Sequence, residues 1–315
     1  MIIESLLVYN WQKQIVPPNW LRFLYRSKIL NSSKTFSLPF EIDFYGMRYK
    51  GDIANAIDFH CYFYGAFEKG HLFFWNDVAN AIYNNKGVYV DIGANQGHHS
   101  LFMSSRSKAV YAFEPYERVR NKIVEKVQLN NITNIIIHDV GIGDKDEIMQ
   151  FYAPKGSNLG LGTFVKNQKD RFETGIPLRI VDGDQYFSNT IPDEIHMMKI
   201  DVEAFEKTVI RGLRKTIEKY RPIIVVELEI GLDCSFHSDS ELKLNFPDNY
   251  KFFLFDMWDN NGKKDKRKEG KFRKKGTYKL KPLDFACLKE QSDIIAFPEE
   301  RLQEFNNYFP AILVK

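Results

Sequence analysis

The sequence has 315 residues, of which 44% are hydrophobic and 27% are charged, and these values are ordinary for a globular protein. This composition excludes a wholly disordered chain, and the length allows about two domains or one large domain with extensions. The formal net charge is only +3, so a surface that attracts anions would have to be a local feature.

The cysteine spacing and the hydropathy of the chain indicate in which cellular compartment the protein resides. Cys61, Cys234 and Cys287 lie far apart and form no C-x-x-C pair, which argues against a disulfide framework or a structural zinc site. The first ten residues lack the features of a signal peptide, and no stretch approaches the roughly 18 apolar residues of a membrane span. We therefore expect a cytoplasmic protein without a membrane span.

The first 85 residues are rich in aromatic side chains and show no repeated period. We interpret residues 1–85 as an N-terminal extension whose helices pack against a sheet. Tyr62 or Tyr64 could instead present a ring on which a sugar stacks.

Short apolar runs alternate with helical patterns after residue 86. The runs predict buried strands at 88–92, 109–113, 135–137, 197–200 and 223–226, with later strands at 252–255 and 294–297. Apolar residues recur on one face at 119–127 and at 205–217, which predicts two helices, and the second should end before Pro222. This alternation predicts an α/β fold with a doubly wound parallel sheet.

A glycine-containing turn, Asp91-Ile-Gly93-Ala94-Asn95-Gln-Gly97, follows the first predicted strand. Ligands of open α/β sheets bind at the carboxyl ends of the strands, and Gly93 and Gly97 would let the backbone approach a ligand closely.

Glu114 ends the second predicted strand, where a carboxylate can accept hydrogen bonds from both hydroxyls of a ribose. The turn lacks the G-x-G-x-x-G spacing of pyrophosphate sites, and the negative charge of Asp91 favours a ligand with a cationic centre. S-adenosylmethionine is such a ligand, because it has a sulfonium, an ammonium and a ribose but no phosphate.

These features occur together with motifs that resemble those of FkbM-type methyltransferases, within the class I S-adenosylmethionine-dependent superfamily. The resemblance covers about residues 86–230. It is carried by VDIGANQG at 90–97, AFEP at 112–115, VGIGD at 140–144, MKIDVEAFE at 198–206 and PIIVVE at 222–227. The family usually has Gly where this chain has Ala204.

The resemblance implies a Rossmann-like class I methyltransferase domain over residues 86–315, with a seven-stranded sheet whose last strand is antiparallel. Residues 1–85 would form a cap over the cofactor, S-adenosylmethionine. The implied contacts are the methionine part with the turn (Asp91, Gly93, Ala94, Asn95, Gly97), the ribose with Glu114, and the adenine with Asp139 and Val140. Alternatively, His138 and Asp139 form an exposed turn. The implied reaction is O-methylation of a hydroxyl on a sugar, a glycan or a small metabolite.

Asp201, Glu203 and Glu227 follow or end the fourth and fifth predicted strands, so they should meet at the ligand face. They could hold the cofactor's ammonium and orient the acceptor, or one could be a general base for the acceptor hydroxyl. They could also bind a divalent cation, although we expect no metal, and helix capping would explain Asp201 and Glu203 without any ligand. His98 or His99 could reach the cleft as a base, but a structural role at a helix start is favoured.

Residues 263–275 carry nine basic and two acidic residues, a local charge of +7, so the rest of the chain carries −4. A solvated loop is the favoured interpretation of this basic segment, and an arm that binds an anionic partner is the alternative. A nucleic-acid methyltransferase is disfavoured, because Asp201-Val-Glu-Ala replaces the (Asp/Asn)-Pro-Pro-aromatic motif of amino-group base methyltransferases. A catalytically silent cofactor-binding module is a further alternative, and a dinucleotide-dependent oxidoreductase is disfavoured by the glycine spacing.

Overall fold

The computed structural model describes residues 37–153, 162, 175–192, 194–202, 204–228, 235–256, 276–288 and 291–313. Glu203, the basic segment 263–275 and most of the first half of the N-terminal extension lie outside the described residues, so the expectations for them stay predictions.

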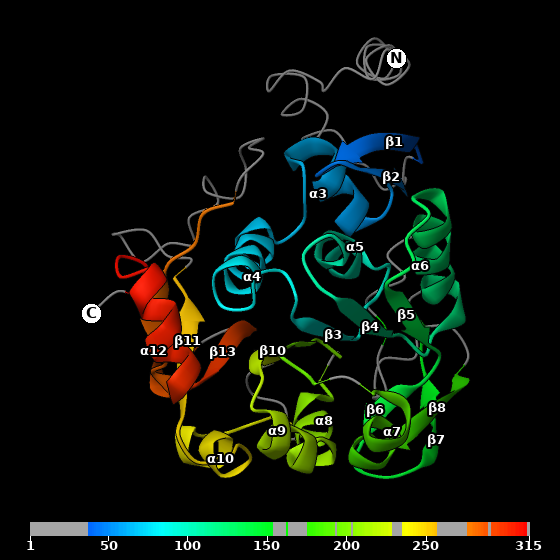
Figure 1. Ribbon diagram of the computed structural model, residues 1–315. Coiled ribbons are helices and arrows are strands. Elements are labelled where there is room, and N and C mark those ends of the chain that lie inside the picture. Colours follow the sequence, from blue (N-terminus) through cyan, green and yellow to red (C-terminus); the bar gives the residue numbers. More distant parts are fainter. Residues whose placement is uncertain are drawn as a thin grey trace.

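An eight-stranded sheet forms the centre of the described structure (Figure 1), in the order β12-β11-β13-β10-β9-β3-β4-β5. The parallel strands are β3 (Val88–Ile92), β4 (Ala109–Phe113), β5 (Ile135–His138), β9 (Met197–Ile200) and β10 (Ile223–Leu228). They are followed by β11 (Tyr250–Phe255), β12 (Leu280–Pro282) and β13 (Ser292–Pro298). The last strand, β13, runs antiparallel between β10 and β11. The α/β fold with seven strands and an antiparallel last strand is confirmed, and the short β12 extends the edge.

Helices cover both faces of this sheet (Figure 1). One face packs against α3 (Ala56–Tyr64), α4 (Lys69–Ala81), α5 (His98–Ser104), α6 (Glu117–Leu129) and α12 (Glu299–Tyr308). The other face packs against α7 (Gly183–Thr190), α8 (Glu206–Gly212), α9 (Arg214–Tyr220) and α10 (Asp239–Leu244). Successive residues of β3 alternate between the two cores: Tyr89 belongs to the first, and Val88 and Val90 belong to the second. Burial on both faces explains why the strands are continuous apolar runs.

The N-terminal part shares its core with the sheet. β1 (Pro39–Phe44) and β2 (Met47–Asp52) form an antiparallel hairpin, and α3 and α4 follow it. Tyr62 and Tyr64 are buried in the same core as the sheet's Tyr89. None of the helices in the described part of the chain combines the length and the apolar character needed to cross a bilayer.

A second, three-stranded sheet lies beside the main one and consists of β6 (Gly141–Gly143), β8 (Ile176–Asp182) and β7 (Glu147–Phe151). β6 pairs with β8 in parallel, and β7 pairs with β8 antiparallel. A short 3-10 helix, Phe285–Cys287, precedes β13. The small sheet matters for function because it supplies one wall of the cavity described below.

The helix predicted over 205–217 is two helices, α8 and α9, separated at Leu213, whose φ of −107° and ψ of 15° leave the helical region. Gly212 packs directly on the small sheet, where an added Cβ would lie 1.8 Å from the Gly143 carbonyl oxygen. This close approach fixes the end of α8. The apolar face continues across the break, because Val209, Leu213 and Ile217 are all buried. As predicted, α9 ends before Pro222.

The turn between β9 and α8 contains a strained alanine. Ala204 has a φ of +73°, a left-handed conformation that costs an L-residue with a Cβ about 1–2 kcal/mol. The buried Glu206 side chain accepts hydrogen bonds from the backbone N–H groups of Val202 and Ala204, both at 3.2 Å, and holds the turn closed. Burial raises the pKa of Glu206 to about 7 against these hydrogen bonds.

We expect Ala204→Gly to raise the free energy of unfolding by about 1 kcal/mol, because glycine adopts the left-handed region without strain. Urea denaturation measures this change. The same replacement at Ala79, within α4, is the control and should lower stability by at least about 0.5–1 kcal/mol. Equal losses at both positions would contradict the strain at residue 204.

Candidate active site

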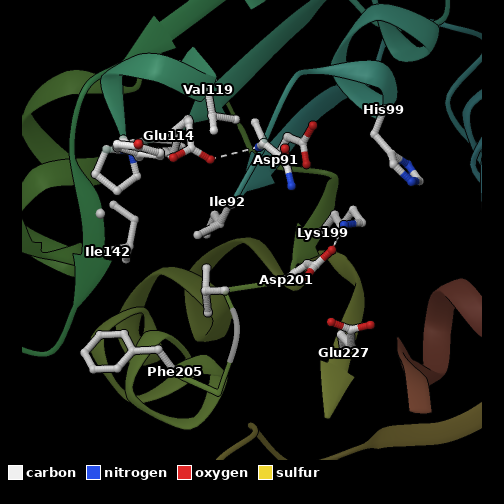
Figure 2. Close-up of a pocket in the computed structure, with 18 of the residues that line it drawn as sticks. Asp91, Ile92, His99, Glu114, Val119, Ile142, Lys199, Asp201, Phe205 and Glu227 are labelled. Atoms are coloured by element: carbon white, nitrogen blue, oxygen red, sulfur yellow. Dashed lines mark hydrogen bonds and ion pairs between the residues drawn. The ribbon is translucent and has the colours of Figure 1, made fainter. Parts of the chain in front are cut away.

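A cavity of about 270 Å³ lies at the carboxyl ends of β3, β4, β9 and β10 (Figure 2). The small sheet borders it through Ile142 and Ile180, and the N-terminal part borders it through Ala56, Ile57 and Glu68. This edge is where open α/β sheets bind their ligands.

Asp91 is almost completely buried beneath the glycine turn, at 1% exposure. Its Oδ2 accepts a hydrogen bond from the Ser100 hydroxyl at 2.5 Å. Its Oδ1 is buried and has no hydrogen-bond partner among the described residues, and leaving such an atom unpaired is costly. Oδ1 therefore marks a position for a cationic or hydrogen-donating group of a ligand.

Glu114 follows β4 and is held by two backbone groups. Its Oε2 accepts from the N–H of Asn95, and its Oε1 accepts from the N–H of Tyr116, both at 2.9 Å. Burial raises the pKa of Glu114 to about 7 in spite of these hydrogen bonds. Each oxygen keeps a further lone pair that a ligand hydroxyl can use.

The glycine turn owes its shape mainly to close packing. Gly93, Ala94 and Asn95 line the cavity. Gly93 has a φ of +77°, and a Cβ there would lie 1.8 Å from the Asp201 carbonyl oxygen. Gly97 is not among the lining residues, and a Cβ there would lie 2.9 Å from Ile123. Gly97 therefore lets α5 pack against α6, and its contact with a ligand stays a prediction.

Opposite the acidic side, the cavity wall is largely apolar. Figure 2 shows Glu114, Ile142 and Phe205 on one side, and His99, Lys199 and Glu227 on the other. The apolar lining residues are Phe113, Pro115, Tyr116, Val119, Ile142, Phe151, Leu178, Ile180, Val202 and Phe205. Such a wall suits a flat heterocycle.

The structure does not bring Asp139 and Val140 to this wall. Asp139 is exposed, Val140 is buried, and neither lines the cavity, whereas Gly141 and Ile142 do. The adenine contacts of Asp139 and Val140 stay a prediction.

The predicted carboxylates Asp201 and Glu227 meet at the cavity, together with a lysine that the sequence interpretation did not single out. The ammonium of Lys199, 4% exposed, lies 2.5 Å from Asp201 Oδ2. Burial and the neighbouring carboxylates of Asp201 and Asp293 raise the pKa of Glu227 to about 11. Asp293 is the residue opposite Glu227 in the β10–β13 pair. This crowding favours the protonated form of Glu227.

A second polar cluster lies where α4 and α5 begin. His99 Nε2 lies 2.9 Å from Glu68 Oε2, and His71 Nδ1 lies 3.6 Å from the same oxygen, while its Nε2 lies 3.4 Å from Asp293 Oδ2. Burial alone would raise the pKa of Glu68, but the two imidazoles hold it well below its ordinary value. Burial alone would lower the pKa of His71, but Asp293 and Glu68 raise it to about 9.

The sequence carries a usable signal for Lys199 and for the two histidines. A lysine inside an apolar run, as Lys199 is in Met-Met-Lys-Ile, is seldom buried without a charged partner. His98 and His99 follow the glycine turn directly. Glu68 and Asp293 carry no such signal, because only tertiary packing brings them to the cavity.

Comparison with known proteins agrees with the motifs. Residues 91–245 match the model of the methyltransferase FkbM domain. Methyltransferase 1 of Beauveria bassiana is 26% identical over 157 residues, which cover 44% of this chain and 63% of that protein. The hexuronic acid methyltransferase AglP of Haloferax volcanii is 24% identical over 147 residues, which cover 46% of this chain and 57% of that protein. The chain thus spans about three-fifths of the length of these relatives.

Among solved structures, an FkbM methyltransferase from Methylobacillus flagellatus KT aligns at 12% identity with a TM-score of 0.41, covering 70% of this chain and 48% of that one. The strand order and the antiparallel β13 confirm the class I methyltransferase fold. By motif and by domain match, residues 91–245 belong to the FkbM methyltransferase family.

Proposed function

We propose that this protein is an S-adenosylmethionine-dependent O-methyltransferase that acts on a hydroxyl of a sugar, a glycan or a small metabolite. The proposal rests on the positions of Asp91 and Glu114. They lie at the ends of the adjacent strands β3 and β4, and the glycine turn that follows Asp91 contacts Glu114 through the N–H of Asn95. A buried unpaired carboxylate oxygen and a carboxylate with free lone pairs match a ligand with one cationic end and a ribose.

The residues present fit this cofactor. Asp91 Oδ1 and Asp201 would face its charged methionine part, and Glu114 would accept hydrogen bonds from the ribose hydroxyls. Gly93, Ala94 and Asn95 would lie along its methionine part, and the apolar wall that includes Ile142 and Phe205 would border the adenine. When bound, S-adenosylmethionine supplies a methyl group that is already activated by a sulfonium.

The carboxylates beyond the cofactor region would handle the acceptor. Burial and the neighbouring carboxylates raise the pKa of Glu227, so it would donate a hydrogen bond to an acceptor oxygen. Asp201 is the carboxylate that would take the proton from the acceptor hydroxyl, and its contact with Lys199 fixes its position. Glu203 stays a predicted partner of Asp201. Much of the remaining rate enhancement would come from positioning.

A sugar acceptor is supported by the polar end of the cavity and by the relative from Haloferax volcanii, which is named a hexuronic acid methyltransferase. Glu68, Glu227 and Gln291 line that end and provide several donors and acceptors for a polyhydroxylated ring. The N-terminal part would serve as the predicted cap, and the basic segment 263–275 remains a proposed contact for an anionic acceptor or partner.

Asp91→Asn should weaken the binding of S-adenosylmethionine at least about tenfold, because an amide replaces the negative charge that faces the cationic end. Isothermal titration calorimetry measures this effect. The binding of 5′-methylthioadenosine, which lacks the methionine amine and carboxylate, should change little. Equal losses for both ligands would contradict the assigned role of Asp91.

The affinity for 5′-methylthioadenosine should rise about tenfold between pH 6 and pH 8, because the ribose hydroxyls donate best to an ionised Glu114 with a pKa of about 7. The ligand itself does not titrate in this range. Glu114→Gln should weaken binding and flatten the pH dependence. A wild-type affinity that stays constant across this range would contradict the pH dependence assigned to Glu114.

Methyl transfer itself can be measured with labelled S-adenosylmethionine and a panel of hexuronic acid and neutral sugar glycosides. We expect a labelled methyl ether, and Asp201→Asn should lower the turnover rate at least about a hundredfold. Asp248→Asn, an exposed acid away from the cavity, is the control and should keep its activity. Transfer at an unchanged rate by Asp201→Asn would exclude Asp201 as the base.

A further inference from the structure

Three side chains of metal-ligand type meet on the cavity wall beside the proposed cofactor region. Glu68, His98 and His99 each offer one ligand atom, and these atoms all lie within 4.8 Å of one another. All three residues line the cavity. The two histidines are 4% and 2% exposed, so the cluster faces the cavity rather than bulk solvent.

The histidines have unused coordinating atoms. Neither ring nitrogen of His98, nor Nδ1 of His99, has a hydrogen-bond partner in the described part of the chain. Buried polar atoms are normally paired, and each unpaired one costs stability. The ring of Phe67 lies edge-on to His98, with centroids 5.5 Å apart, and supplies no polar partner. A bound cation would take one nitrogen of each ring.

Glu68 takes an unusual backbone conformation at this position. It is the N-cap residue of α4, with a φ of +48°, yet its side chain makes no capping hydrogen bond to the helix. Its carboxylate contacts His99 instead. A non-glycine residue held in the left-handed region is often found at a ligand site, and here the conformation accompanies a carboxylate turned toward the two imidazoles.

We propose that Glu68, His98 and His99 form a binding site for a divalent transition-metal ion of the zinc type. Two imidazole nitrogens and one carboxylate oxygen suit such an ion. Two cationic side chains lie nearby. Lys199 pairs with Asp201, and His71 lies between Glu68 Oε2 and Asp293 Oδ2, at 3.6 Å and 3.4 Å, so Asp293 shares its charge. This ligand set is separate from Asp201, Glu203 and Glu227.

Three protein ligands would leave a coordination position on the cavity side for a water or an acceptor oxygen. An acceptor hydroxyl bound there would be more acidic and would be held near Asp201, which would take its proton. This role in orienting the acceptor rests on the proposed methyltransferase function, whereas binding of the ion does not.

The test uses the full chain freed of metal by a chelator and titrated with zinc chloride in a calorimeter. We expect about one zinc ion per chain. His98→Asn, His99→Asn and Glu68→Gln should each lower the zinc affinity at least about tenfold. His237→Asn, at an exposed position, is the matched control and should bind zinc as the wild type does.

Folding is checked on each variant by S-adenosylmethionine binding and circular dichroism. If a histidine variant does not fold, the absorption spectrum of the cobalt-loaded wild type decides: a four-coordinate spectrum supports the site, and the spectrum of hydrated cobalt overturns it. A folded wild type that binds no zinc overturns the proposal, as do folded variants that all bind zinc like the wild type. Zinc binding without S-adenosylmethionine binding would overturn only the proposed function.

Discussion

A buried ammonium organises the polar side of the cavity. Lys199 lies in the middle of the sheet at 4% exposure, and the carboxylates of Asp201, Glu68 and Asp91 all act on it. A buried charge of this kind is tolerated only when opposite charges surround it. Burial opposes the charged form, but these carboxylates raise the pKa of Lys199 above its ordinary value. Three segments far apart in the sequence are thereby held around one cation: the start of α4, the end of β3 and the turn after β9.

The excess of carboxylates over the cationic Lys199 and His71 also supports the proposed binding of a positively charged ligand. Within the described part of the chain, Asp91 Oδ1 has no hydrogen-bond partner, and the crowding of acids raises the pKa of Glu227. An affinity for the proposed cationic cofactor and the raised pKa of Glu227 would both follow from the same crowding of acidic groups.

The sequence allowed the prediction of the parallel sheet, the glycine turn and the acids that end the strands, because each depends on local periodicity or on a short motif. Asp91, Glu114, Asp201 and Glu227 all follow this rule and all line the cavity. Glu68 could not be predicted in this way, because its left-handed conformation and its approach to α5 arise only from tertiary packing. The break between α8 and α9 could not be predicted either, because the apolar face continues through Leu213 without a gap.

The position of β13 has a consequence for how the chain is made. β13 lies between β10 and β11, although residues 292–298 follow both of those strands in the sequence. As the chain leaves the ribosome, β10 presents an unpaired edge, and β11 can pair only with the short β12 until β13 is synthesised. Exposed edges of this kind favour pairing with other chains. The nascent protein therefore passes through a stage in which the sheet is vulnerable to aggregation, and insertion of β13 ends that stage as it delivers Asp293 to the cavity.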